Sequence, residues 1–527
     1  MRDFELPGRS PVHSTEAMVA TSNPLASSTA IDILRRGGNA IDAAVAAAAV
    51  LAVVEPYQTG IGGDCFVLLA PKGGADLIAF NGSGRAPGKA EIDWYFENNF
   101  REVPIASAHA VTIPGAVDAW AQLVRDHGRM SLGELLQPAI RYAEEGYPVH
   151  SRAAFDWTGC EGLLKQDTIA TGIFLPNGKA PKTGERFRQP QLAHTLRLIA
   201  TQGREGFYQG PVAEDIVNHL RSRGGHHTLA DFAEARGNYV QPISTSYRGV
   251  DVYQLPPNNQ GITALIMLNI LSTYSFVDMD PVGAQRLHLE IEAGRLAYRD
   301  RDVYIGDSVA ADVIDQLLSQ EHAAELASEI DQSRAGSPST VDSGHGSDTV
   351  YLCVVDQERN AVSLINSIFH SFGSGLVSPN TGVVLQNRGA GFRIEPGHPN
   401  CIAPGKRPLH TIMPGMALKD GRVVMPFGVM GGHYQPFGNA HVLSNILDFG
   451  CDLQQALDMP RVFYEAGCVQ VERGISESTR DGLVALGYRL ARPDEPLGGG
   501  QAIWIDWESG VLTGGSDSRM DGCALGY

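Results

Sequence analysis

The chain has 527 residues, of which 43% are hydrophobic and 19% charged, with a formal net charge of −18. This composition is typical of a folded globular protein and argues against extensive disorder. Because a large negative charge repels phosphate backbones and anionic lipid headgroups, we expect neither nucleic acid nor a membrane surface as a partner. The expected partner is a small-molecule substrate.

Residues 1–19 carry charges and prolines where a secretory signal needs an apolar core of about 7 to 15 residues. The longest apolar tract, residues 43–54, is too short to span a bilayer. The seven cysteines are scattered and form no Cys-x-x-Cys pair. We therefore expect a cytoplasmic protein with reduced thiols and no metal site.

Two helices are predicted near the N-terminus. Asn23 suits the N-cap of the first helix and Pro24 its first position. The second helix, residues 40–53, is apolar on nearly every face, which places it inside the protein. The glycine-rich stretch 60–63, before a predicted strand at 65–69, has two interpretations: a tight turn, or a close approach of the backbone to a ligand.

The next predicted strand, residues 75–80, leads to Arg85, which stands among glycines at the strand end. Side chains at strand ends reach clefts, but most lone arginines are simply solvated, so both interpretations stay open. A Ser-x-x-Glu capping box at 131–134 marks the start of a helix. Further helices are predicted at 262–271 and 284–299.

The stretch 332–348 is nearly all small, polar or turn-forming, so it predicts a flexible leader without a packed core. From Thr349 to Asp356 the pattern becomes β-branched and apolar, and a second strand follows at 361–365. Thr349 is therefore expected to begin a buried hairpin. Beyond it strands and glycine turns dominate, with a last helix at 453–458.

Thr349 itself has two interpretations. A β-branched residue at a strand start needs no function, because strands favour such residues. Alternatively, a cut between Asp348 and Thr349 would create an N-terminal threonine with a nucleophilic hydroxyl. The freed α-amine, whose reference pKa is about 7.7 to 8, would then accept the hydroxyl proton. The rest of the chain decides between the two.

Several motifs stand in a fixed order along the chain: residues 37–44, 60–66, the Thr-x-x-x-x-Val-Val-Asp run at 349–356, Arg-Pro at 407–408 and Gly-Gly at 431–432. Together they resemble the γ-glutamyltranspeptidases, a family of self-processing N-terminal-nucleophile hydrolases. The resemblance extends almost from end to end. It favours the nucleophilic interpretation of Thr349.

The resemblance implies an α+β fold, a four-layer αββα sandwich that forms a single domain. It also implies a precursor that cuts itself into a large chain, residues 1–348, and a small chain, residues 349–527. These two chains would stay together as partners. The sequence leaves open whether two such heterodimers form a dimer.

The same resemblance assigns the catalytic residues. Thr349 would be the nucleophile, and the bond between Asp348 and Thr349 the autocleavage site. Gly431 and Gly432 match the oxyanion hole, where backbone N–H groups stabilise negative charge. Ser367 matches a hydroxyl that orients the nucleophile; the family has threonine there, and the hydrogen-bonding group is retained. Neither a metal nor an organic cofactor is implied.

The substrate pocket departs from the family pattern. The family holds a glutamyl group with an arginine and two serines for its carboxylate, an asparagine and an aspartate for its amine, and a nearby glutamine. At the matching positions this chain has, in that order, Ser83, His410 and Thr411, Phe369 and Gly391, and Arg388. In addition, Arg85 has appeared close to Ser83.

Without the aspartate that binds the α-ammonium group of a glutamyl substrate, a charge-assisted hydrogen bond of about 1.5 to 3 kcal/mol is lost, so a glutamyl group should bind poorly. An added guanidinium favours an anion without an amine, because it pairs with carboxylate in a bidentate fork. The expected substrate-binding residues are Arg388, Arg85, His410, Thr411 and Phe369. They suit a small carboxylate-bearing amide that is shorter than glutamyl.

The sequence as a whole resembles family members that convert oxamate to oxalate and ammonia in purine-ring breakdown. Oxamate carries a carboxylate beside its amide and no amine, which suits the altered pocket, and this is the leading functional hypothesis. One alternative is a γ-glutamyltranspeptidase, a glutathione hydrolase or a cephalosporin-acylase-like enzyme. Another is a binding protein that kept the fold and lost catalysis. The sequence leaves open whether the acyl group passes to water or to another acceptor, and whether His370 and His410 touch substrate.

Overall fold

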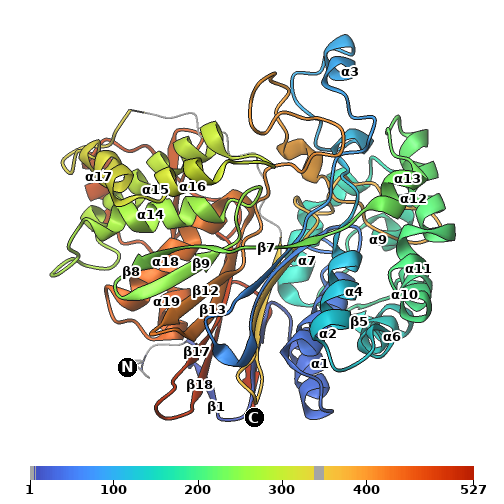
Figure 1. Cartoon of the computed structure of the whole chain (residues 1–527), viewed down its shortest axis with the longest axis horizontal. Helices are drawn as coiled ribbons and strands as arrows, with labels where there is room; N and C mark the ends of the chain where they lie inside the picture. The colour runs from blue at the N-terminus through green and yellow to red at the C-terminus, as the bar shows by residue number, and fades with distance from the viewer. Residues whose placement is uncertain (1–4, 6–7, 338–348) are drawn as a thin grey trace.

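The computed structural model describes residue 5, residues 8–337 and residues 349–527. Two seven-stranded sheets face each other, and helices cover the outer side of each sheet (Figure 1). This arrangement is the predicted four-layer αββα sandwich. Among the described residues, no helix has the length and apolar character needed to cross a bilayer.

The first sheet contains the hairpin that follows Thr349. Its strands in spatial order are β19 (Cys523–Gly526), β2 (Met18–Thr21), β10 (Val350–Val355), β11 (Ala361–Ser367), β3 (Asp64–Ala70), β4 (Ile78–Gly82) and β7 (Asn238–Val240). The strand pairs of this sheet are antiparallel. The hairpin thus lies at the centre of its sheet.

The second sheet combines strands from both ends of the chain. Its spatial order is β1 (Val12–Ser14), β18 (Leu512–Ser516), β17 (Gly499–Ile505), β13 (Arg422–Met430), β12 (Gly415–Lys419), β9 (Val250–Gln254) and β8 (Ile243–Tyr247). Strands from before and after Thr349 lie side by side in both sheets. The two expected chains would therefore share one core.

Strand β10 shows how the layers are held together. Val350, Leu352 and Val354 pack into the cluster that includes the helices over the first sheet, while the residues between them pack between the two sheets. Because successive side chains of a strand point to opposite faces, a strand buried on both sides is apolar throughout. In the hairpin, Val350 lies opposite Asn366, which brings the start of β10 to the end of β11.

The helices over the first sheet include α1 (Pro24–Arg35), α2 (Ala40–Val54), α4 (Ala116–His127), α6 (Gln137–Glu145), α10 (Pro190–Gln202), α11 (Glu205–Tyr208) and α12 (Gly210–Ser222) (Figure 1). Those over the second sheet include α14 (Gly261–Ser272), α15 (Ala284–Tyr304), α17 (Gln320–Ser328), α18 (Gln435–Leu447) and α19 (Leu453–Asp458).

Shorter elements complete the fold. They are α3 (Ile92–Glu97), α5 (Leu132–Leu135), α7 (Ser151–Gly159), α8 (Glu161–Leu164), α9 (Thr168–Phe174), α13 (Leu229–Glu234), α16 (Ala311–Leu317) and α20 (Glu477–Ala485). Two small sheets are formed by β5 (Tyr147–Pro148) with β6 (Arg186–Phe187), and by β14 (Val462–Glu465), β15 (Cys468–Val471) and β16 (Leu490–Ala491).

Several predicted elements are confirmed, and two are corrected. The helix at 453–458 is not the last one, because α20 (Glu477–Ala485) follows it. Every residue of α2 is buried, as its apolar sequence predicts. Helix α19 has the predicted bounds, and α15 continues past residue 299 to Tyr304. The expectation of strands and glycine turns around residue 435 is wrong, because α18 begins there. Pro436 lies in the first turn of α18, where the missing N–H costs no helical hydrogen bond.

Part of the predicted leader, residues 332–348, lies outside the described residues, namely 338–348 with Asp348. The described part lies against the helices over the second sheet. The Ala335 amide donates to the Leu486 carbonyl (2.6 Å), and the Gly336 amide donates to Glu292 Oε1 (3.3 Å). The expected boundary between a large and a small chain stays a prediction.

Candidate active site

Thr349 is almost completely buried at the start of β10. Its hydroxyl donates to Ser367 Oγ (3.3 Å), which the antiparallel hairpin places across from it at the end of β11. On the other side, Gln435 Nε2 donates to Thr349 Oγ1 (3.5 Å) from the first turn of α18. The Thr349 hydroxyl is thus contacted by Ser367 from the first sheet and by Gln435 from helix α18, which covers the second sheet.

Ser367 connects Thr349 to the predicted substrate pocket. Its Oγ accepts a hydrogen bond from the Phe369 amide (2.8 Å) and another from Arg388 Nη2 (3.1 Å). Arg388 Nη1 in turn donates to Thr411 Oγ1 (2.6 Å). The structure therefore gathers the predicted nucleophile, the predicted orienting hydroxyl and three predicted substrate-binding residues into one hydrogen-bonded cluster.

Arg388 is fully buried, and among the described residues no carboxylate lies within ion-pair distance (4.0 Å) of it. Its Nε–H has no hydrogen-bond partner in the described part of the chain. Burial lowers the pKa of Arg388 to about 9, although the charge of Asp64 acts in the opposite direction. The guanidinium therefore still carries its charge at neutral pH, next to the nucleophile.

The ring of Phe369 covers this guanidinium, whose central carbon lies 4.0 Å from the ring centroid. The attraction between a cation and the face of an aromatic ring partly replaces the missing counter-ion. Phe369 also has a φ of +81°, which is rare for a bulky residue and costs about 1 to 3 kcal/mol. A strained backbone thus holds the ring over the charge.

His410 directly precedes Thr411 of this cluster. It is fully buried, and its Nε2 lies 3.0 Å from Asp64 Oδ2. Burial and then the positive charge of Arg388 lower the pKa of His410 to about 3, so its ring is neutral. Asp64 Oδ1 accepts hydrogen bonds from the Gly84 and Gly115 amides (2.9 and 3.0 Å). His410 does not line the cleft described below, and its predicted contact with substrate stays a prediction.

The Gly431-Gly432 pair lies between the end of β13 and the start of α18. The two residues have φ values of +125° and +55°, which L side chains rarely adopt. Gln260 Nε2 donates to the Gly432 carbonyl (3.0 Å) and so fixes this peptide. Gln435, three residues after Gly432, reaches Thr349, so the predicted oxyanion hole and the nucleophile are linked through the start of α18.

A cleft of about 340 Å³ opens onto this cluster. Phe369 and Thr411 line it, together with His370 and His433. Its lining also includes Arg101, Glu102, Val103 and Ile105, which precede Thr349 in the chain by more than two hundred positions. Arg393, Glu395 and other charged groups line it as well. A small molecule in the cleft would contact Phe369 and Thr411, the two members of the cluster that line it, whereas Thr349, Ser367 and Arg388 are not part of its lining.

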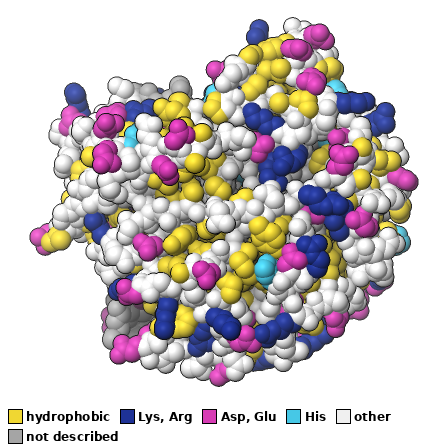
Figure 2. Space-filling view, in the orientation of Figure 1, with side chains coloured by type: hydrophobic (Ala, Val, Ile, Leu, Met, Phe, Trp, Pro, Cys, Tyr) yellow, Lys and Arg dark blue, Asp and Glu magenta, His cyan; other side chains and the backbone are white. Residues whose placement is uncertain are grey.

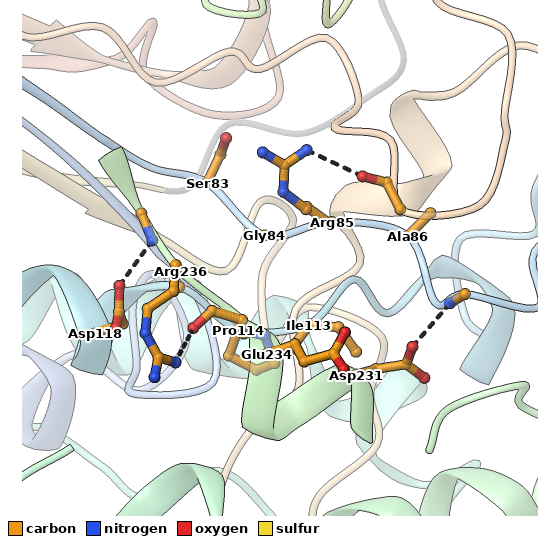
Figure 3. A pocket seen from close by; sticks show the side chains of 15 residues that line it. Ser83, Gly84, Arg85, Ala86, Ile113, Pro114, Asp118, Asp231, Glu234 and Arg236 are labelled. Carbon is orange, nitrogen blue, oxygen red and sulfur yellow. Dashed lines mark hydrogen bonds between the residues drawn. The ribbon is translucent and has the colours of Figure 1, made fainter. Parts of the chain in front are cut away.

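Arg85 lies elsewhere. It lines a separate cavity of about 220 Å³ with Ser83 and Arg236, in which its guanidinium donates to the Gly405 carbonyl (3.0 Å) (Figure 3). Asp307 Oδ2 lies 3.6 Å from the same guanidinium. The structure therefore does not bring Arg85 to the cleft lined by Thr411 and Phe369; its guanidinium is held at the other cavity by Gly405 and Asp307.

Comparison with known proteins agrees with this site. The model of the gamma-glutamyltranspeptidase family matches residues 26–527. The chain belongs to this family. It is accordingly a hydrolase of amide C–N bonds that is made as a proenzyme.

Three members of the gamma-glutamyltranspeptidase family illustrate its range. The glutathione hydrolase-like YwrD proenzyme of Bacillus subtilis is 38% identical over 98% of this chain and 99% of its own length. The oxamate amidohydrolase proenzyme of Klebsiella pneumoniae is also 38% identical, with the same coverage. The crystal structure of cephalosporin acylase from Bacillus halodurans, 41% identical, matches 100% of this chain and 99% of its own, with a TM-score of 0.92.

The sequence analysis missed several residues of the site. The missed residues contact partners that are far away in the chain; they are Asp64, Gln260, Gln435 and Arg301. Only Asp64 had a local signal, since it ends the glycine-rich stretch before β3. The glycines of that stretch pack closely against the protein's own backbone: a side chain at Gly62 or Gly63 would collide with the carbonyl oxygen of Val384 or Ser367, respectively, at 2.1 Å. The approach to a ligand stays a prediction.

Proposed function

We propose that this family member is an N-terminal threonine amidohydrolase that acts on a small carboxylate-bearing amide, with oxamate converted to oxalate and ammonia. The observation that carries the proposal is Arg388: a buried, charged guanidinium beside the nucleophile, with no carboxylate partner among the described residues. A buried charge is costly unless it is paired. An anionic substrate would supply the missing partner.

The proposed first step creates the enzyme from its precursor. Thr349 Oγ attacks the carbonyl carbon of Asp348, and the C–N bond breaks as the Thr349 nitrogen takes a proton. The resulting ester is hydrolysed by water. This leaves a large chain ending at Asp348 and a small chain that begins with the free α-amine of Thr349, which is the base needed for turnover.

In turnover, the α-amine accepts the Thr349 hydroxyl proton while Oγ attacks the amide carbon of the substrate. The N–H groups of Gly431 and Gly432 stabilise the oxyanion. The carboxylate of the substrate pairs with Arg388, and Thr411 orients the guanidinium. Collapse of the intermediate breaks the C–N bond, the proton passes to the departing nitrogen and ammonia leaves. Water then hydrolyses the acyl-enzyme.

Two amides of nearly equal shape test the proposal. Oxamate carries a carboxylate where oxamide carries a second, neutral amide. Purified enzyme, shown by mass spectrometry to be cut before Thr349, should release ammonia from oxamate with a kcat/KM at least about 10-fold higher than from oxamide. Equal rates on the two amides, or efficient release from a γ-glutamyl anilide with none from oxamate, would overturn the proposed substrate.

A second candidate follows from the size of the cleft, which at about 340 Å³ exceeds what oxamate needs. A short anionic acyl group could sit at Arg388 while a larger amine fills the outer cleft, as an acylase requires. The likeness to a cephalosporin acylase supports this alternative. Hydrolysis of a glutaryl-cephem at a higher kcat/KM than oxamate would favour it and would retain Thr349 and Arg388 in the same roles.

A further inference from the structure

His433 directly follows the Gly431-Gly432 pair, and it lines the cleft beside Phe369. The two rings meet edge to face, with centroids 6.2 Å apart and planes at 72°. No role has been given to this imidazole so far. Its position beside the expected oxyanion hole means that any substrate in the cleft passes close to it.

Helix α15 holds His433 by two residues one turn apart. The Tyr298 hydroxyl donates to the His433 carbonyl, and Arg301 Nη1 lies 3.0 Å from His433 Nδ1. Because residues three apart share a helix face, both contacts come from the same side of α15. Backbone and ring of His433 are thus fixed together.

The hydrogen bond from Arg301 determines which ring nitrogen carries the proton. A guanidinium has only donors, so the His433 Nδ1 that faces it must offer a lone pair. A neutral imidazole with an acceptor at Nδ1 carries its proton on Nε2. Arg301 therefore makes His433 a donor at the nitrogen that is left for the cleft.

Arg301 is itself held in place. It is 1% exposed, and both its Nε and Nη2 contact Asp302 Oδ1 (2.8 and 2.7 Å). Its Nη1 also donates to Gln260 Oε1 (3.1 Å), and Gln260 holds the carbonyls of Thr411 and Gly432. One side chain thus positions His433 and, through Gln260, the peptide of the expected oxyanion hole and the residue that orients Arg388.

The charges around His433 favour the neutral ring. Burial, then the positive charge of Arg301, and after it His370 and Arg388 lower the pKa of His433 well below its ordinary value. Three acidic groups line the same cleft, Glu102, Asp302 and Glu395, and the carboxylate of Asp302 pairs with Arg301. The ring is therefore expected to stay neutral across the working pH range, unlike an ordinary histidine.

We propose that His433 is a specificity-determining residue: its Nε2–H donates a hydrogen bond to an oxygen of the bound amide, and Arg301 is the positioning residue that fixes its tautomer. The proposal rests on the proposed function, since it concerns the same cleft. In this arrangement Arg388 would bind the carboxylate of the acyl group, and the neutral His433 would donate to one further oxygen.

Two substitutions separate the ring nitrogens. His433→Asn keeps an acceptor near the Nδ1 position for Arg301 but removes the donor at Nε2, whereas His433→Gln places an amide donor near Nε2. We expect the KM for oxamate to rise about 3- to 10-fold in H433N and less than about 2-fold in H433Q, with kcat little changed in both. Equal increases in the two variants, or a loss of kcat at constant KM, would overturn the proposal.

Nitrogen NMR on wild-type enzyme with 15N-labelled histidine tests the tautomer without relying on turnover. His433, assigned by its absence from H433N, should show a proton on Nε2 from pH 5 to 9, and added oxalate should shift that signal. A proton on Nδ1, or a ring that titrates near pH 6.5, would overturn the proposal even if oxamate is hydrolysed. Failure to hydrolyse oxamate with the expected tautomer intact would instead count against the proposed substrate alone.

Discussion

Arg388 and Arg85 are two arginines from which the same task was expected, and the fold places them in opposite situations. Arg388 is fully buried, without a carboxylate in ion-pair distance among the described residues. The Arg85 side chain is 43% exposed and has both a carbonyl and Asp307 beside it. An arginine that awaits an anion is therefore distinguished by burial without a counter-ion and not by its residue type.

The surface of the molecule gives the context for Arg85. Lysine and arginine side chains are scattered among acidic ones over the visible face (Figure 2). In such surroundings solvent and nearby carboxylates satisfy a guanidinium at little cost, and an exposed ion pair contributes about 0 to 1 kcal/mol. The charge of Arg85 is thus already compensated by solvent and neighbouring groups, whereas the charge of Arg388 lacks a carboxylate partner among the described residues.

The largest expected effect concerns the nucleophile on which both arginines would depend. Thr349→Ala should stay uncut and lose activity about a thousandfold or more, since it lacks the hydroxyl for both cleavage and turnover. Thr349→Ser keeps a hydroxyl and should still be cut. Denaturing mass spectrometry and ammonia release measure the two results; two fragments from the alanine variant would rule out Thr349 as the attacking residue.

Replacing each arginine by methionine tests the contrast directly. Arg388→Met should lower kcat/KM for oxamate about 10- to 100-fold, because a charge-assisted hydrogen bond contributes about 1.5 to 3 kcal/mol. Arg85→Met is the matched control and should change it less than about 2-fold. Oxamide, which is neutral, should lose far less in the Arg388 variant. If both variants lose the same factor on oxamate, the distinction between the two arginines is wrong.

The layers of the fold could be predicted well from sequence, because they depend on local pattern. The burial of α2 and the hairpin after Thr349 follow from unbroken apolar runs. Helix α18 was missed because it starts three residues after a glycine pair, and its apolar residues are spread over most of its surface, so no amphipathic period stands out. Strand order was also out of reach, since β2, which pairs with β10, and β19, which pairs with β2, come from the two ends of the chain.

The site divides in the same way. The identities of Thr349, Ser367 and Arg388 could be predicted from a resemblance in order and spacing, and the structure brings them together. What failed was the position of Arg85, because its partners Gly405 and Asp307 lie more than two hundred positions away in the chain and no local pattern reveals them. Arg301 and His433 were beyond prediction, since their roles come from a contact across 132 positions of sequence.

Glu55 is a second buried titratable group, and unlike Arg388 it is expected to be neutral at neutral pH. This carboxyl is fully buried and accepts hydrogen bonds from Ser22 Oγ (2.7 Å) and Asn23 Nδ2 (3.4 Å), with no cation in ion-pair distance among the described residues. Burial raises its pKa to about 8. Unlike Arg388, Glu55 can therefore lose its charge by staying protonated, and it needs no ligand.

The consequence is a pH dependence of stability with a defined sign. Between pH 5 and 6.5 the unfolded Glu55 is ionised and the folded one protonated, so folding loses about 1.4 kcal/mol per pH unit from this group as pH rises. Glu55→Gln has no titratable group at this position, so its free energy of unfolding lacks this decrease with pH. Denaturant unfolding should thus show the variant gaining about 2 kcal/mol on wild type over this interval. A constant difference between the two proteins would mean that Glu55 is ionised in the fold.

The smallest expected effect concerns the ring that covers Arg388. Phe369→Leu removes the aromatic face, and a cation–π contact is worth about 0.5 to 2 kcal/mol, so the guanidinium loses one of the contacts that offset its burial, while its hydrogen bonds to Ser367 and Thr411 remain. Phe369→Tyr keeps the face and serves as the control. If the ring holds the guanidinium in place for the substrate, KM for oxamate should rise about 3-fold in the leucine variant and stay near wild type in the tyrosine variant. A lower KM in the leucine variant would instead show that the ring competes with the substrate carboxylate for the guanidinium, and that Arg388 binds its anion best when nothing else offsets its charge.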